Sequence, residues 1–66
     1  MIASAFLYET TAGDIKLSLR SIAPFDVNMI AQQFGGGGHV RAAGATLKGT
    51  LEESVTQVLA AMEKNL

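Results

Sequence analysis

The sequence predicts a two-layer α+β fold with the element order β-β-α-β-α, in which a small mixed sheet carries its helices on one face. Two observations lead to this prediction: a period-two hydrophobic pattern near the start of the chain, and two later segments with helical periodicity. With 66 residues and no cysteine, the chain forms one small domain that no disulfide stabilises. Its stability must come from core packing or from a partner.

The first two elements form a predicted β-hairpin. Residues 2–10 are apolar, aromatic and β-branched, residues 11–14 are typical of a turn, and residues 15–20 alternate strictly. The buried face of the second strand should consist of Ile15, Leu17 and Leu19. Because residues 2–10 carry apolar groups on both faces, we also expect this strand to promote self-association into a homo-oligomer.

A short helix should follow the hairpin. Pro24 interrupts the extended pattern, Asp26 is a favourable N-cap, and Gly35 ends the helix. The apolar residues recur at helical spacing; they are Val27, Ile30, Ala31 and Phe34. A strand, a helix and a further strand in succession favour a right-handed crossover between parallel strands, so we expect a mixed sheet.

The last part of the chain predicts one more strand and a closing helix. Residues 45–48 suit the strand, and Thr50 and Glu53 form a capping box that begins the helix. One apolar stripe of this helix should face the core; it consists of Leu51, Val55, Val58, Leu59, Met62 and Leu66.

The segment between these elements, GGGGHVRAAG (35–44), has the most unusual composition of the chain. Consecutive glycines leave their backbone N–H groups accessible, so they can form a concave anion site that His39 and Arg41 complete. Alternatively, one glycine caps the helix and the others form a flexible connector. The negative end of the helix dipole opposes anion binding here, and a further helical turn over residues 39–43 would reverse that sign. Without this turn, the anion site would depend on Arg20, His39 and Arg41 alone and would be weaker.

The charges are unevenly distributed, although the net charge is only −1. Residues 15–49 hold four basic residues, Lys16, Arg20, Arg41 and Lys48, against Asp26 alone. This excess predicts a local positive surface near the glycines that suits an anionic ligand. No apolar run reaches the roughly 18 residues of a membrane span, and no signal peptide is recognisable, so we expect a cytoplasmic protein without a membrane partner.

The order of these features resembles the DHHA1 domain of DHH-family phosphoesterases. The resemblance rests on the strand end SLRS (18–21), the helix ending at Phe34, and the GGGGHVRAAG segment before a strand. It covers roughly residues 2–62 and is greatest to nano-RNases and phosphoadenosine-phosphate phosphatases. It implies a module that binds a short RNA or a phosphorylated nucleotide and closes over a separate DHH domain, in which two manganese ions activate water. It also implies that residues 1–66 are the C-terminal portion of a DHHA1 domain from a larger protein.

The candidate substrate-binding residues are Arg20, Ser21, Gly36, Gly37, Gly38, His39 and Arg41. The resemblance implies that the first two contact a phosphate or base, that the glycines present their backbone, and that His39 touches the phosphate nearest the metals. Arg41 is included because of the charge pattern and not because of the resemblance, since relatives often have a polar residue such as asparagine at this position.

No catalytic or metal-binding residue is predicted in this chain. Two-metal hydrolysis requires clustered carboxylates and histidines, whereas this chain has one histidine and scattered acidic residues. We therefore expect the isolated chain to be inactive and the parent protein to be a hydrolase. Two alternatives stay open: a structural or dimerisation module with a glycine hinge, and an RNA-binding appendage, for which more exposed aromatic residues would be typical. Convergence of Arg20 and His39 on the glycine segment would favour the binding module.

Overall fold

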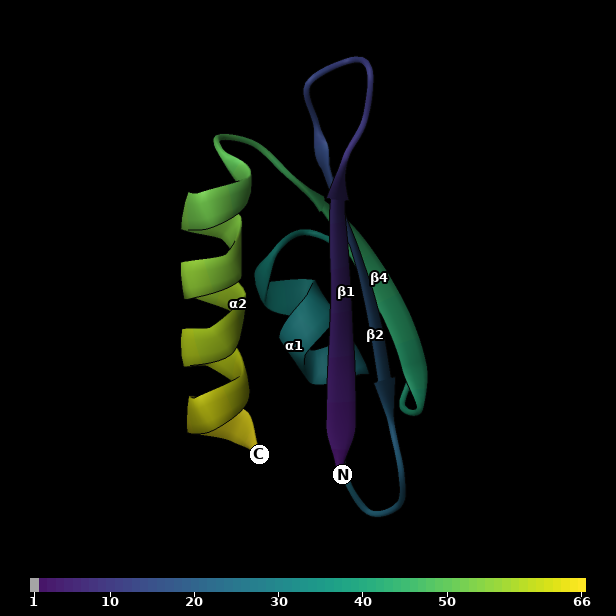
Figure 1. Cartoon of the computed structure of the whole chain (residues 1–66). Helices are drawn as coiled ribbons and strands as arrows, with labels where there is room; N and C mark the ends of the chain where they lie inside the picture. The colour runs from purple at the N-terminus through teal and green to yellow at the C-terminus, as the bar shows by residue number, and fades with distance from the viewer. Residues whose placement is uncertain (1) are drawn as a thin grey trace.

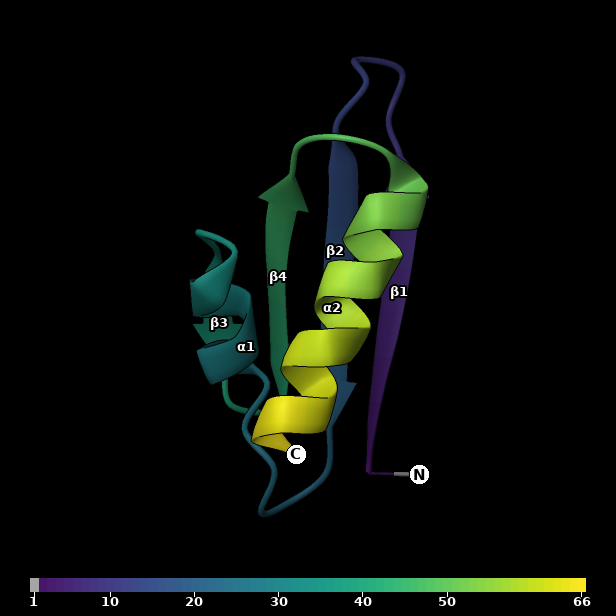
Figure 2. The same ribbon diagram turned by 90° about the vertical axis from the view of Figure 1, so that its left-hand side faces the viewer.

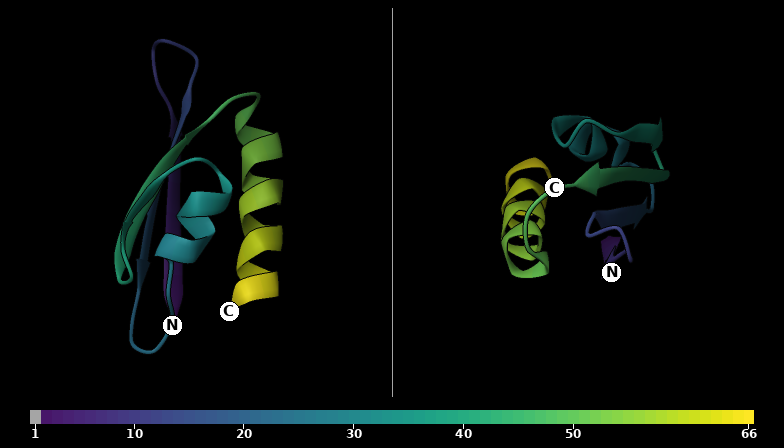
Figure 3. Two further views of the ribbon diagram at one scale, coloured as in Figure 1. Left: turned by 180° about the vertical axis from the view of Figure 1, so that it is seen from behind. Right: turned by 90° about the horizontal axis from the view of Figure 1, so that it is seen from above.

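The computed structural model describes residues 2–66 and contains the expected elements plus one short strand (Figure 1). In chain order the elements are β1 (Ala3–Glu9), β2 (Ile15–Ser21), α1 (Asn28–Gln33), β3 (Gly37–His39), β4 (Ala42–Leu47) and α2 (Leu51–Asn65). Both helices lie on one face of a four-stranded sheet, as the view from above shows (Figure 3). The predicted two-layer α+β fold is therefore confirmed.

The sheet is antiparallel throughout, with the strand order β1-β2-β4-β3. The expected mixed sheet with a parallel crossover is thus wrong in its strand directions. The physical reason is β3: the chain leaves α1, runs along the sheet edge, and reverses at Val40 and Arg41 before it enters β4. This additional reversal makes β4 antiparallel to β2.

The core lies between the sheet and the two helices (Figure 2). As predicted, alternate residues of β2 are buried there, and the buried apolar set as a whole is Ile15, Leu17, Leu19, Val27, Ile30, Ala31, Ala43, Leu47, Val58 and Ala61. The other residues of β2, Lys16, Ser18 and Arg20, lie on the opposite side of the sheet. No helix within residues 2–66 covers that side, which we call the open face.

Local signals set the ends of α1. Asp26 caps the helix as predicted, because its Oδ1 accepts the backbone N–H groups of Asn28 and Met29 at 2.8 and 3.3 Å. At the other end Gly35 has a φ of +80°, the left-handed conformation that closes a helix. The first glycine of the run is therefore a helix cap.

The predicted capping box of α2 is confirmed. The N–H of Glu53 donates to Thr50 Oγ1, and the N–H of Thr50 donates to Glu53 Oε1, both at 3.0 Å. The expected apolar stripe is wrong in part, since Leu51, Val55 and Leu59 are exposed. The buried residues of α2 are Ser54, Val58 and Ala61, and Met62 and Leu66 pack partly buried against the core, so Val58, Met62 and Leu66 of the expected stripe are confirmed.

The difference is a rotation about the helix axis, since the buried positions of α2 are Ser54 and those four and seven residues after it. Val55 and Leu59 each lie one position, or about 100° around the helix, from a residue of the buried face. Within residues 2–66, neither helix has the length and hydropathy of a membrane span.

Candidate functional site

The glycine segment forms a hairpin with β4. Gly37–His39 is β3, Val40 and Arg41 form the turn, and Ala42 begins β4. The helical turn expected over residues 39–43 is therefore wrong. An anion nest also needs successive residues whose backbones alternate between right- and left-handed helical conformations, whereas the backbone of β3 is extended. A ligand site here therefore depends on the side chains that neighbouring strands bring together.

Packing against β4 explains two of the glycines in the candidate site. A Cβ on Gly36 would lie 2.1 Å from the carbonyl oxygen of Gly44, which no backbone shift could easily relieve. Gly38 has a φ of +150°, and a Cβ there would lie 2.7 Å from a carbonyl oxygen of β4. Gly37 differs, because the nearest atom to its Cβ position is 3.5 Å away, in α1. Close approach of the strands thus accounts for much of the run.

Arg20 and His39 lie on one line across the sheet. The register pairs Arg20 with Ala42, and Ala42 with His39. Residues directly opposite one another in a ladder project to the same face, here the open face. Two strand spacings, about 10 Å, separate the backbones of Arg20 and His39, with Ala42 between them in the ladder. The register thus places both residues on one line beside the glycine hairpin.

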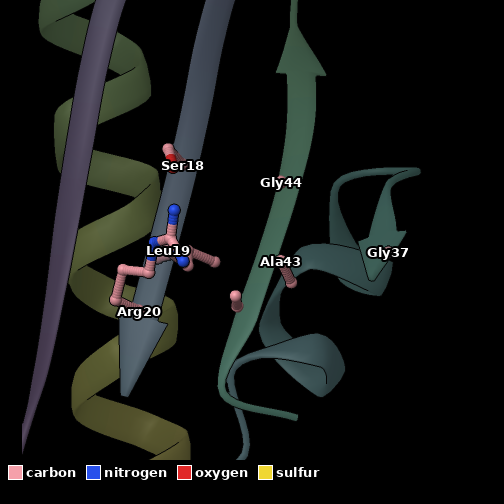
Figure 4. Close-up of a pocket in the computed structure, with 7 residues that line it drawn as sticks. Ser18, Leu19, Arg20, Gly37, Ala43 and Gly44 are labelled. Atoms are coloured by element: carbon pink, nitrogen blue, oxygen red, sulfur yellow. The ribbon is translucent and has the colours of Figure 1, made fainter. Parts of the chain in front are cut away.

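A hollow of about 270 Å³ opens on this line (Figure 4). It is lined by Ser18, Leu19, Arg20, Gly37, Ala42, Ala43 and Gly44. Figure 4 shows the Arg20 side chain running back along β2 towards Ser18, while Gly37 and Gly44 contribute no side chain. Small residues beside an arginine let an anionic group come close to the sheet, where the guanidinium can donate hydrogen bonds to that group. We call this feature the Arg20 hollow.

A second hollow of about 430 Å³ adjoins it. Its lining residues are Lys16, Leu17, Gly35, Gly36, Gly44, Ala45 and Thr46, so the two hollows share Gly44. Lys16 Nζ donates a hydrogen bond to Thr46 Oγ1 at 3.0 Å, which holds the ammonium group across the sheet beside this second hollow. A basic side chain therefore borders each of the two neighbouring hollows.

Ser21 and Arg41 hold the hairpin turn in place. Ser21 Oγ lies 2.7 Å from the carbonyl oxygen of Phe25 and 3.0 Å from that of Val40, and its single hydrogen serves one of them at a time. Arg41 Nη1 donates a hydrogen bond to the same carbonyl oxygen of Phe25 at 2.8 Å. The backbone N–H of Val27 donates to the carbonyl oxygen of Val40 at 3.0 Å. The structure thus gives Ser21 and Arg41 contacts within the scaffold beside the site, which the sequence did not predict.

The predicted local positive surface is present on the open face. Throughout residues 2–66 the carboxylates lie elsewhere: Glu9 pairs with the core residue Ile15, which places it on the helix side. The other acidic residues lie in turns, a loop or α2; they are Asp14, Asp26, Glu52, Glu53 and Glu63. Lys48 forms an ion pair with Asp14 at the end of the sheet. Lys16 and Arg20 are therefore the basic residues that a ligand on the open face would meet.

Sequence reasoning missed the residues that form the floor of the Arg20 hollow, namely Ser18, Ala42 and Gly44. The alternation of β2 already placed Ser18 on the same side as Arg20. For Ala42 and Gly44 the only signal was their small size after His39, because their position depends on a register between strands far apart in sequence.

The described residues bring together no group of three or more His, Cys, Asp or Glu side chains that could hold a metal ion. The chain's own side chains in residues 2–66 therefore do not fit a manganese pair.

Comparison with known proteins gives a consistent result. The family model of the DHHA1 domain matches residues 2–66. The chain is 44% identical over 66 residues to the bifunctional oligoribonuclease and PAP phosphatase NrnA of Thermus thermophilus, covering 98% of this chain and 20% of that protein. The crystal structure of an exopolyphosphatase-related protein from Bacteroides fragilis matches with a TM-score of 0.88 and 45% identity, covering 96% of this chain and 18% of that one.

The chain spans about a fifth of the length of these two relatives. The match to the family model extends over every described residue, and the similar structure has the same fold. This chain therefore belongs to the DHHA1 domain family.

Proposed function

We propose that this chain is the substrate-binding module of a DHH-type phosphoesterase and that it binds a phosphate group of a short RNA or a phosphorylated nucleotide. The observation that supports this function best is the alignment of Arg20, Ala42 and His39 across the sheet, in which Arg20 and Ala42 line the Arg20 hollow. The names of the relatives, an oligoribonuclease and PAP phosphatase and an exopolyphosphatase-related protein, favour a phosphorylated ligand.

Each side chain has a role in this proposal. The planar guanidinium of Arg20 donates two parallel hydrogen bonds to phosphate oxygens, and the imidazole of His39 donates from the other side of Ala42. Gly37 and Gly44, which pair across β3 and β4, have no side chains to fill the hollow and so leave room for the phosphate over the strands. Because the hollow is open to water, we expect the chain alone to bind with a dissociation constant in the millimolar range. This corresponds to a binding free energy of about −4 kcal/mol.

Hydrolysis belongs to a separate DHH domain in this proposal, and manganese is the metal that we expect there. The residues of this chain bind and orient the phosphate. The isolated chain should therefore show no phosphoesterase activity with added manganese. A cytoplasmic location stays a prediction.

The test is an NMR titration of the ¹⁵N-labelled chain with adenosine 3′,5′-bisphosphate. We expect amide shifts to cluster at Arg20, Gly37 and His39, and Arg20→Ala or His39→Ala to weaken binding at least about fivefold, since each removes a charge-assisted hydrogen bond. Lys64→Ala is the control for Arg20→Ala, because it removes the same charge from α2, in the other layer. It should change the affinity less than about twofold.

Shifts centred on α2, or equal losses in Arg20→Ala and Lys64→Ala, would show that the open face is not the binding site. That result would favour the structural module, for which the exposed Leu51, Val55 and Leu59 on α2 offer a contact surface.

A further inference from the structure

The open face carries an unexpected pair of aromatic residues. Phe6 and Tyr8 are 63% and 48% exposed, although the opposite side of the same strand packs smaller residues such as Ala3 and Ala5 against the core. Their ring centroids are 5.6 Å apart, and the ring planes are tilted by 44°. Leaving a phenylalanine in water forgoes roughly 1.5–3 kcal/mol of burial. A ligand that covers the pair would recover part of this energy.

The neighbours of this pair are polar or basic. The register places Ser18 opposite Phe6 and Lys16 opposite Tyr8. Arg20 is the diagonal neighbour of Phe6, at a distance of about 7–8 Å for such positions. Within residues 2–66, no acidic side chain shares this face. The surface therefore combines aromatic faces with positive charge.

This combination suits one class of ligand. A second copy of the chain placed face to face would bring Lys16 and Arg20 of one copy against the same residues of the other, which disfavours that contact. An apolar peptide would leave the two basic groups without counter-charges. An oligonucleotide provides both complements, since its bases stack on aromatic rings and its phosphates pair with basic side chains.

We infer that Phe6 and Tyr8 form a stacking subsite for an unpaired base of a single-stranded oligonucleotide whose phosphate occupies the Arg20 hollow. The inference rests on the proposed function, which supplies the phosphate position. The diagonal from Arg20 to Phe6 has the scale of one nucleotide, so a base attached to the bound phosphate reaches the rings without leaving the face. A base paired within a duplex does not expose its ring face, which restricts the ligand to single strands.

The stacking subsite predicts which phosphorylated ligands this module prefers. A ligand that consists of phosphate groups alone contacts only the basic residues, whereas a ligand with bases also stacks on β1. The chain should therefore bind a short oligonucleotide more tightly than a polyphosphate of similar charge.

The experiment compares two probes, the 5′-phosphorylated adenosine dinucleotide and inorganic pyrophosphate, in NMR titrations of the 66-residue chain. Phe6→Ala should weaken dinucleotide binding about five- to hundredfold and leave pyrophosphate binding unchanged, because stacking is lost and the phosphate contacts stay. Phe6→Leu keeps apolar area without a π face and should lose affinity as well. Leu59→Ala removes an apolar side chain of similar exposure, 53%, from α2 and is the matched control.

Tyr8 supplies a direct readout, because it is the only tyrosine of a chain without tryptophan. The dinucleotide should quench its fluorescence and shift its ring protons upfield, and pyrophosphate should do neither. Since Phe6 is mostly exposed, its substitution should leave the melting temperature unchanged.

The outcomes separate the two proposals. If both probes bind in an Arg20-dependent way but Phe6→Ala leaves dinucleotide affinity unchanged, the stacking subsite is wrong and the proposed function stands. If neither probe binds, or if Arg20→Ala has no effect on either, the proposed function fails and the subsite with it.

Discussion

Ser54 lies on the buried side of α2 with 1% of its surface exposed, and its Oγ has no hydrogen-bond partner. A hydroxyl removed from water without a partner costs about 1–3 kcal/mol. Serine is also a weaker helix former than alanine. The residue is therefore a local weakness in a small core.

We expect Ser54→Ala to stabilise the chain by about 1 kcal/mol, because it removes the unpaired hydroxyl and improves helix propensity. For a domain of this size, thermal unfolding should shift upwards by about 4–8 °C. Thr56→Ala, on the exposed side of α2, serves as the control for helix propensity alone and should stabilise the chain less than Ser54→Ala does, by at most about 0.7 kcal/mol. A lower melting temperature for Ser54→Ala would show that the hydroxyl has a partner in solution.

Glu53 couples the start of α2 to pH. Its pKa lies below the ordinary value of 4.5 because the carboxylate accepts the backbone N–H of Thr50 and, secondly, its hydroxyl. A pKa lowered by folding means that the carboxylate stabilises the folded chain above pH 4.5, and that this contribution disappears as the pH falls through the lowered value.

Glu53→Gln should therefore be less stable than the wild type at pH 7, and the difference should shrink as the pH is lowered below 4.5. Urea unfolding at a series of pH values measures this. Thr50→Ala, which removes the hydroxyl that caps the helix, should also reduce the pH dependence. A gap between wild type and Glu53→Gln that stays constant with pH would contradict the explanation.

At the scale of elements, β3 lies so close to β4 that neither Gly36, which precedes β3, nor Gly38, within it, has room for a side chain. Gly36→Ala should destabilise the chain by at least about 2 kcal/mol, because the methyl group meets a backbone oxygen that cannot rotate away. Gly37→Ala should be tolerated, or should even stabilise the strand by up to about 1 kcal/mol.

Urea unfolding of the two variants measures this contrast, and each serves as the control for the other. If Gly36→Ala is tolerated as well as Gly37→Ala, β3 and β4 are further apart than the structure shows.

Local signals made several elements predictable from the sequence. The alternation of β2, the cap at Asp26 and the capping box of α2 depend on residues that are close in sequence, and all three are confirmed. β3 was not predictable in this way, because glycines carry no hydrophobic pattern and their extended state depends on the edge of β4. The rotation of α2 was not predictable either, because its apolar residues span a wider arc than its buried face and only tertiary packing selects among them.

The candidate site was predictable in its residues and not in its arrangement. Composition and resemblance singled out Arg20 and His39, but only the register of β2, β4 and β3 places them on one line. The same register reveals Phe6 beside Arg20, although these residues are separated by a turn. Ser21 and Arg41 were also named as site residues, but their polar groups already have backbone hydrogen-bond partners in the structure.

At the scale of the whole molecule, β1 is an edge strand of the sheet in residues 2–66. Its unpaired backbone groups can pair with β1 of another copy in the plane of the sheet, which leaves the open face accessible. We expect a concentration-dependent homodimer with its contact at residues 2–10, and sedimentation velocity over a range of concentrations measures this. Slowed amide exchange in β1 at high concentration should accompany it. A monomer at all concentrations would contradict edge pairing.

The division of charge between the two layers has a kinetic consequence. Glu52, Glu53 and Glu63 lie on α2, whereas Lys16 and Arg20 lie on the open face. The molecule is about 19 Å across its short dimensions, more than the Debye length of about 8 Å at physiological ionic strength. A polyanion therefore meets an attractive side or a repulsive side, not the average of the two. The positive charge accelerates encounters of the polyanion with the open face, and the negative charge of α2 slows encounters with the other layer. Added salt should therefore lower the association rate much more than it raises the dissociation rate.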